Sequence, residues 1–260
     1  MTGREPRSLC RALALAFVGL LALGGEPATA QGQPVDLELV LAVDASSSVS
    51  DEEFDLQMKG LADAFRHEAV MAAIQATGDL GIAVTLIQWS DNLSQSTAVD
   101  WVRINNAQSA EAFGAAVERT PRFLVGGSTA IGGALKYSLR QMERNPYEGR
   151  RKVIDLSGDG RTNQGPPPDE VRDRAVLEGV TINALAILNE DLYVDRYYSR
   201  SVVGGTGAFV LTADDYEDFA DSILLKLIRE IAGAPIALGP AEEEPEQLGR
   251  APTKVAGEGS

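Results

Sequence analysis

The sequence predicts an α/β fold, with a doubly wound, mostly parallel central sheet and helices on both faces. Short apolar segments alternate with segments whose apolar residues recur at helical spacing. The runs GIAVTLIQW at 81–89 and VTINALAIL at 180–188 are apolar almost throughout, which is typical of strands buried on both faces. This alternation indicates parallel strands joined by right-handed crossovers.

The first half of the predicted domain contains three strands and three helices. A helix is expected over 51–71, because apolar residues from Phe54 to Phe65 recur at steps of four, three and four. Asn145-Pro146 ends the last helix of this half. The other expected elements are strands at 36–43, 81–89 and, as an edge strand, 96–102, and helices at 109–119 and 131–144.

The second half continues the same pattern. Strands are expected at 152–156, 180–188 and 208–211, and helices between Pro166 and Gly179 and over 191–203. Thr212 or Asp214 is expected to cap a final helix, whose apolar stripe contains Phe219, Ile223, Leu227 and Ile231. Residues 233–260 are rich in Gly, Ala, Pro and Glu and are expected to form a flexible tail.

The first thirty residues resemble a secretory signal peptide. Arg4, Arg7 and Arg11 precede an apolar run at 12–23, and Ala28-Thr29-Ala30 supplies the small residues before a cleavage point. The run has about twelve residues, too few to span a bilayer of about 30 Å. We expect cleavage after Ala30, a short linker at 31–35, a folded domain at 36–232, and an exported protein that is periplasmic or secreted.

Composition excludes several classes of function. The formal net charge of −15 disfavours nucleic acid and anionic membranes as partners. Cys10 is the only cysteine, so an intramolecular disulfide and a thiolate metal cluster are excluded. His67 is the only histidine and is expected to be a solvated helix residue, so a catalytic triad or a histidine-rich zinc site cannot form.

Three segments at one edge of the predicted sheet carry oxygen-bearing side chains. D-A-S-S-S at 44–48 and S-G-D-G at 157–160 follow strands, and G-G-S-T at 126–129 precedes a helix. Ligands bind at this edge of open α/β sheets, and oxygen ligands suit a hard cation such as Mg²⁺ or Mn²⁺. Each segment also has an ordinary interpretation: Ser48 or Ser50 as a helix cap, and the others as a turn and a loop.

Together, D-A-S-S-S, G-G-S-T-A-I-G-G-A-L at 126–135 and S-G-D-G resemble the metal-ion-dependent adhesion site of von Willebrand factor type A domains. The resemblance covers about 36–232 and is closest to a group of exported bacterial proteins without an assigned function. S-G-D-G stands where T-D-G is frequent, and a serine precedes Thr129. The resemblance implies that the metal ligands are Asp44, Ser46, Ser48, Thr129 and Asp159.

The same resemblance implies a role in binding. Neutral hydroxyls and water-mediated carboxylates leave the charge of Mg²⁺, Mn²⁺ or Ca²⁺ incompletely neutralised, with one coordination position open. An Asp or Glu side chain of a partner protein can then complete the metal shell. Thr129 is the residue expected to enter the shell with that partner.

Enzymatic functions are less consistent with the sequence. Asp44 could be the nucleophile of a haloacid-dehalogenase phosphatase, but the second aspartate that such enzymes need is replaced by Ser46. No P-loop follows a strand, and no G-x-S-x-G elbow is found. We expect a binding protein that is not an enzyme; the alternatives are a structural domain with an empty or vestigial site and a metal-dependent hydrolase.

Overall fold

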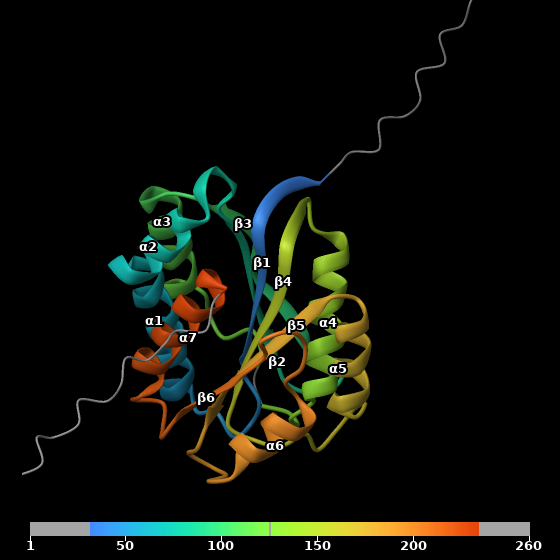
Figure 1. Ribbon diagram of the computed structural model, residues 1–260. Helices are drawn as coiled ribbons and strands as arrows, with labels where there is room; N and C mark the ends of the chain where they lie inside the picture. The colour runs from blue at the N-terminus through green and yellow to red at the C-terminus, as the bar shows by residue number, and fades with distance from the viewer. Residues whose placement is uncertain (1–31, 125, 234–260) are drawn as a thin grey trace, which may run out of the picture. The chain divides into compact units, whose positions relative to one another are not determined.

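The computed structural model describes residues 32–124 and 126–233 and contains one six-stranded sheet of order β3-β2-β1-β4-β5-β6 (Figure 1). All neighbouring strands pair in parallel except β2 and β3, which are antiparallel. The predicted α/β fold with a mostly parallel sheet is therefore confirmed. The strands are β1 (Gln33–Asp44), β2 (Ile82–Trp89), β3 (Gln95–Ile104), β4 (Tyr147–Gly158), β5 (Val180–Ile187) and β6 (Val210–Ala213).

Helices cover both faces of the sheet (Figure 1). One face packs against α1 (Asp51–Arg66), α2 (Glu68–Ala76), α3 (Ala107–Glu118) and α7 (Phe219–Ala232). The other packs against α4 (Ile131–Arg144), α5 (Pro168–Leu177) and α6 (Val194–Ser201). A single 3₁₀ turn, Gly78–Leu80, precedes β2. Within the described ranges, no helix combines the length and the apolar character needed to cross a membrane.

Alternate residues of each strand enter two separate apolar cores. Leu37, Leu39 and Leu41 of β1 face the layer that contains α1 and α7, whereas Val40 and Ala42 face the layer that contains α4. All five side chains are at most 2% exposed. Burial on both faces is what the apolar runs predict, and it holds β1 and β4 rigidly at the centre of the sheet.

The helix predicted over 51–71 is two helices separated at His67. This residue has extended dihedral angles (φ −73°, ψ 137°), and its Nδ1 accepts a hydrogen bond of 3.1 Å from the amide of Ala69. His67 therefore caps α2, and the expectation that it lies within a helix was wrong. A side chain that competes for backbone amides interrupts the helix despite the continuous apolar pattern.

The last helix also begins later than predicted. Thr212 lies within β6, and α7 starts at Phe219, with Asp218 at the N-cap position. Thr212 and Asp214 are therefore not its caps. The carboxylate of Asp215 accepts hydrogen bonds from the amides of Glu217 and Asp218, at 2.8 and 3.0 Å, and this turn occupies the residues before the helix.

The central strands are longer than predicted at their amino ends. β1 begins at Gln33, within the segment predicted as a linker, and pairs there with Tyr147 at the start of β4. The predicted signal peptide and the tail after Gly233 lie outside the described residues.

Strand order positions the candidate site. From β1, the chain adds β2 and β3 on one side and β4, β5 and β6 on the other. The order therefore reverses between β1 and β4, where ligands of open α/β sheets bind beyond the carboxyl ends of the strands. Val43 is in register with Ser157, so the residues that follow β1 and β4 emerge side by side.

Candidate metal site

The carboxylate of Asp44 ends β1 and organises the turn that follows. Its Oδ1 accepts a hydrogen bond of 2.7 Å from the amide of Ser46, and the Oγ atoms of Ser46 and Ser48 are 3.2 Å apart. Asp44 and Ser46 are fully buried, whereas Ser48 is half-buried. The first predicted segment therefore forms one group of oxygens.

Asp159 brings the β4 loop into the same group. Its Oδ1 accepts a hydrogen bond of 2.8 Å from Ser48 Oγ, and its Oδ2 accepts one of 3.1 Å from the hydroxyl of Tyr216. Asp159 is fully buried. The structure therefore places four of the five predicted ligands, Asp44, Ser46, Ser48 and Asp159, in one connected set of polar contacts.

Thr129 lies next to this group through its backbone. Its amide donates to Asn163 Oδ1 at 2.9 Å, and its carbonyl accepts from the amide of Asn163 at 2.9 Å. Its hydroxyl faces Gly160: a Cβ atom built on that glycine would lie 3.7 Å from Thr129 Oγ1. The loop before α4 is therefore fastened to the loop that contains Asp159, with the Thr129 hydroxyl beside it.

A glycine leaves room for the Asp44 carboxylate. A Cβ atom on Gly158 would lie 2.9 Å from Asp44 Oδ2 and 2.8 Å from the hydroxyl of Tyr198. These separations are closer than real Cβ contacts, so any side chain at position 158 would displace one of the two groups. The first glycine of S-G-D-G is thus a steric requirement of the site.

Burial makes the two carboxylates difficult to ionise. It raises the pKa of Asp44 from 3.8 to about 8, with a second contribution from the charge of Asp159. Burial also raises the pKa of Asp159, although the hydrogen bonds from Ser48 and Tyr216 oppose that shift. Asp44 Oδ2 has no hydrogen-bond partner in the described part of the chain.

These features fit a cation. Neither Asp44 nor Asp159 forms a salt bridge with a described residue, so a cation held between them would offset the free-energy cost of burying their charges. No position in the described ranges gathers three or more His, Cys, Asp or Glu side chains. Any metal bound here would therefore depend on the hydroxyls of Ser46, Ser48 and Thr129 together with two carboxylates, a donor set that suits a hard cation.

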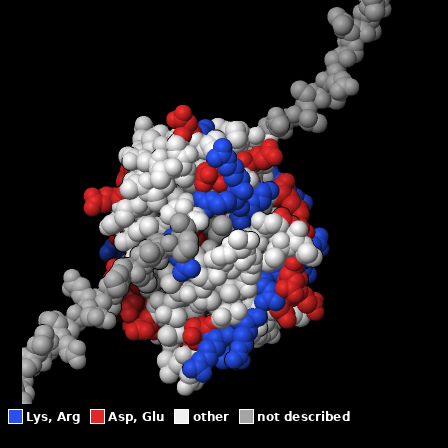
Figure 2. All heavy atoms as spheres, in the orientation of Figure 1, with Lys and Arg blue, Asp and Glu red and all other residues white. Residues whose placement is uncertain are grey.

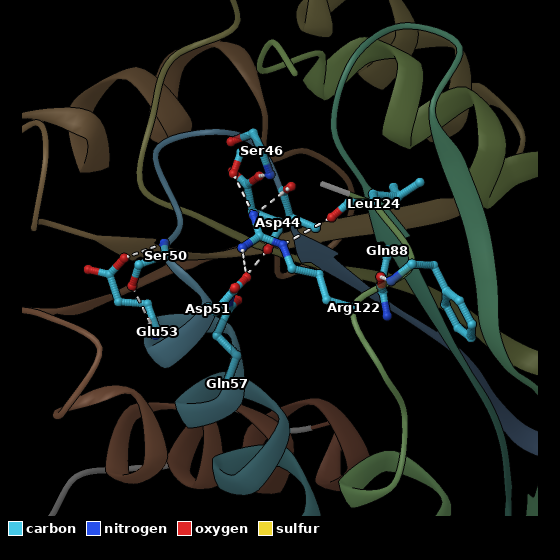
Figure 3. Close-up of polar contacts among 11 residues, drawn as sticks. Asp44, Ser46, Ser50, Asp51, Glu53, Gln57, Gln88, Arg122 and Leu124 are labelled. Atoms are coloured by element: carbon cyan, nitrogen blue, oxygen red, sulfur yellow. Dashed lines mark hydrogen bonds and ion pairs between the residues drawn. The ribbon is translucent and has the colours of Figure 1, made fainter. Parts of the chain in front are cut away.

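Arg122 supports the turn and was not identified from the sequence. Its Nη2 donates to the carbonyls of Ala45 and Ser46, at 3.1 and 3.0 Å, and its Nη1 donates to Asp51 Oδ1 at 2.8 Å (Figure 3). Gln57 of α1 adds a hydrogen bond of 3.2 Å to the carbonyl of Asp44. No local motif marks either residue.

Tyr216 was also missed. It lies in the turn between β6 and α7, far along the chain from every predicted segment, and only the fold brings its hydroxyl to Asp159. Burial and the charge of Asp159 raise its pKa, so Tyr216 stays protonated and remains a hydrogen-bond donor.

A family model described as protein of unknown function (DUF1194) matches residues 34–235. The chain belongs to this family. No curated protein matches the sequence. Among solved structures, the fold is similar to proximal thread matrix protein 1 from the mussel byssus, with a TM-score of 0.59 and 19% identity over 77% of this chain and 48% of that one. The chain thus spans about half the length of that protein.

Two further structures show the same fold. The von Willebrand factor type A structure from Catenulispora acidiphila has a TM-score of 0.52 and 17% identity over 76% of this chain and 43% of that one. The pilus adhesin SpaC from Lactobacillus rhamnosus GG has a TM-score of 0.54 and 17% identity over 76% and 31%. This DUF1194 member therefore has a von Willebrand factor type A-like fold, as the sequence resemblance implied.

Proposed function

We propose that this domain binds one divalent cation through Asp44, Ser46, Ser48, Thr129 and Asp159, with Mg²⁺ the expected ion and Mn²⁺ or Ca²⁺ as alternatives. The observation that carries the proposal is the pair of buried carboxylates, which are linked through Ser46 and Ser48 and form no salt bridge with a described residue. A related observation concerns a protein of similar fold: one structure of the mussel protein, 20% identical with a TM-score of 0.54, has a zinc-occupied MIDAS motif.

The site is proposed to bind a partner and not to catalyse a reaction. When bound, the cation would offer a coordination position to an Asp or Glu side chain of the partner protein. The candidate site lies next to the start of α1, whereas the only histidine, His67, follows the last residue of that helix. His67 is therefore not available at the site as a general acid or base. Ser46 and Ser48 orient the donor oxygens, and Thr129 provides a hydroxyl at the rim.

Exposed apolar side chains at the same edge of the sheet support a protein partner. Leu93 follows β2 and is 90% exposed, Leu192 and Tyr193 follow β5 and are 70% and 55% exposed, and Phe123 is 50% exposed. The amide of Phe123 donates a hydrogen bond to Gln88 Oε1 at the end of β2, which places Phe123 at this edge. Apolar and aromatic groups around a polar centre are typical of protein-binding surfaces.

The proposed setting is outside the cytoplasm, in the periplasm or beyond the cell. The proposal rests on the basic start, the short apolar run and the small residues at 28–30. It agrees with the described roles of proteins that share this fold, among them a pilus adhesin and a minor pilin.

Calorimetric titration of the full chain with Mg²⁺, Mn²⁺, Ca²⁺ and Zn²⁺ tests the metal site. One binding event is expected for the wild type and none for the double variant Ser46→Ala, Ser48→Ala. Equal binding by the double variant would place the metal elsewhere, and no binding by the wild type would support a structural domain with an empty site. Metal-dependent turnover of phosphoester substrates would instead support a hydrolase.

A further inference from the structure

A cavity lies at the end of the sheet opposite Asp44. It has a volume of about 380 Å³ and lies where β4 and β5 begin, beside the last turn of α7. Its lining includes four basic residues, Arg150, Arg151, Lys152 and Arg229. Figure 2 shows Lys and Arg side chains gathered over the beginning of β4, on the face viewed in Figure 1. This concentration of positive charge is unusual for a chain with a net charge of −15.

One of the four basic residues has a structural role. Arg151 donates to the carbonyls of Glu230 and Ile231, at 2.6 and 2.7 Å, and to Asp36 Oδ2 at 2.7 Å. These bonds satisfy carbonyls at the end of α7 that have no partner within the helix. Arg151 therefore caps the carboxyl end of α7, and its hydrogen bonds are already used within the fold.

The other three basic residues have weak or no acidic partners among the described residues. Arg150 is 73% exposed at its side chain and lies 4.0 Å from Asp36 Oδ1. Lys152 Nζ lies 3.8 Å from Glu38 Oε1. The guanidinium of Arg229 stacks 3.7 Å above the ring of Phe209 and forms no salt bridge within the described ranges. Their charges are thus available to a ligand.

The remainder of the lining combines apolar side chains, glycine backbone and a few polar residues, among them Glu230, whose carboxylate is paired with Lys226. Val153, Val180 and Phe209 contribute apolar surface beside the basic residues. Gly207 has a φ of 73°, and a Cβ atom built on it would meet nothing within 4 Å, so a chain can approach the backbone there. Apolar and cationic surfaces side by side fit a peptide with aliphatic and acidic side chains better than they fit a bare inorganic anion.

The chain itself contains such a peptide directly after the cavity. Gly233, which ends α7 with a φ of 66°, is part of the lining. Ile236 and Leu238 follow within a few residues, and then Glu242-Glu243-Glu244 and Glu246. Nine residues reach at most about 30 Å, and a tether this short gives an effective concentration of about millimolar.

We infer that the segment 234–246 docks in this cavity, with its glutamates against Arg150, Lys152 and Arg229 and its aliphatic residues against Phe209. The contacts involve exposed charges, so docking weakens with salt. Docking through a few side chains does not require the tail to contribute to the core. The inference is independent of the proposed metal site.

Paramagnetic broadening in the full chain tests the inference. The variant Cys10→Ser, Gln247→Cys carries one nitroxide label next to the acidic run. At low ionic strength, we expect the amide signals of Thr206 and Gly207 to broaden. The triple change Glu242→Gln, Glu243→Gln, Glu244→Gln is expected to remove most of the broadening, and so is Arg150→Gln. Lys59→Gln, which removes one exposed positive charge on α1, is the matched control and should leave it unchanged.

Two results would overturn the inference. The first is the absence of broadening at Thr206 and Gly207, or broadening that the charge variants do not alter. The second concerns inorganic phosphate, added as a competing probe. Phosphate is added both to the chain with its natural glutamates and to the triple Gln variant. If it shifts the Thr206 and Gly207 signals equally in the two proteins, the cavity binds a free anion, and the tail is not its occupant.

Discussion

The hydroxyl of Ser48 donates a 2.8 Å hydrogen bond to Oδ1 of Asp159, across 111 residues of sequence. This bond joins the turn after β1 to the loop after β4 at the point where strand order reverses. Because Asp159 is buried and lacks a salt-bridge partner in the described part of the chain, Ser48 and Tyr216 are its principal stabilising contacts. A small change at either end should therefore alter the whole site.

Replacement of Ser48 by alanine is the most direct test of that bond. Ser48→Ala should remove the melting-temperature rise that Mg²⁺ produces; at a metal concentration 100 times the Kd, a ligand specific for the folded state contributes about 2.7 kcal/mol. For a domain of this size, the rise is roughly 5–10 °C. Differential scanning fluorimetry with and without EDTA measures it.

Ser50→Ala is the matched control for that experiment. Ser50 caps α1 through a capping box with Glu53 and donates to none of the candidate ligands. Its loss should cost about 1 kcal/mol of stability and leave the response to metal intact. If the two serine variants respond alike, Ser48 is not a ligand.

The stability of the metal-free protein should depend on pH through Asp44. Its pKa is about 8 in the folded state against 3.8 for the ordinary group. Protonation therefore favours the folded state: this stabilisation is complete below about pH 4 and is lost as the pH rises to about 8. Urea unfolding in EDTA should thus show stability falling across this interval.

Asp44→Asn isolates this contribution from that of Glu230, whose pKa burial also raises to about 8. The variant should be more stable than the wild type in EDTA at pH 8, because it carries no buried charge, and should not respond to Mg²⁺. In the wild type, metal and proton compete, so the response to Mg²⁺ should be larger at pH 8 than at pH 5. A variant less stable than the wild type at pH 8 would show that Asp44 already has a favourable charged partner.

Thr129 should matter less to metal uptake than the serines do. Its described hydrogen bonds to Asn163 use its backbone atoms, so Thr129→Ala should preserve the fold. Calorimetry is expected to show a smaller loss of Mg²⁺ affinity for Thr129→Ala than for Ser46→Ala. Thr129→Ser, which keeps a hydroxyl, should restore the affinity. For an identified partner, Thr129→Ala should weaken binding in Mg²⁺; equal partner affinity in Mg²⁺ and EDTA would contradict the adhesion-site mechanism.

Arg122 should act by positioning the turn. Arg122→Gln removes the guanidinium donor from the carbonyls of Ala45 and Ser46, of which Ser46 keeps a hydrogen bond from the amide of Val49. The loss is about 1–3 kcal/mol if the Ala45 carbonyl stays buried. The weak effect of its charge on Asp44 is outweighed by the misplaced turn, so Mg²⁺ affinity should fall. Asp51→Asn breaks only the outer ion pair and should have little effect. Affinity retained in Arg122→Gln would show that Gln57 suffices to hold the turn.

The prediction that the protein is exported can be tested by mass spectrometry. Intact-mass analysis of the protein recovered from its native host should give a chain that begins at Gln31. A recovered chain that retains Met1 would contradict the signal-peptide interpretation.

The sequence allowed the sheet and its ligand edge to be predicted because both depend on local patterns. Apolar runs mark β2 and β5, Asp44 is the last residue of β1, and Asp159 directly follows β4. Arg122 and Tyr216 could not be predicted, because their partners are set by tertiary packing and no spacing rule marks them. The break at His67 was missed for a different reason: a capping hydrogen bond overrides an apolar stripe that continues across it.

The central pairing of β1 with β4 has a kinetic consequence. Ser48 and Asp159 meet only after a loop of 111 residues has closed, and such contacts of high sequence separation form slowly. If the pairing completes after the rate-limiting step of folding, a bound ion cannot speed refolding and acts only on the reverse reaction. Metal would then prolong the lifetime of the native state by slowing its unfolding, a useful property where refolding assistance is scarce.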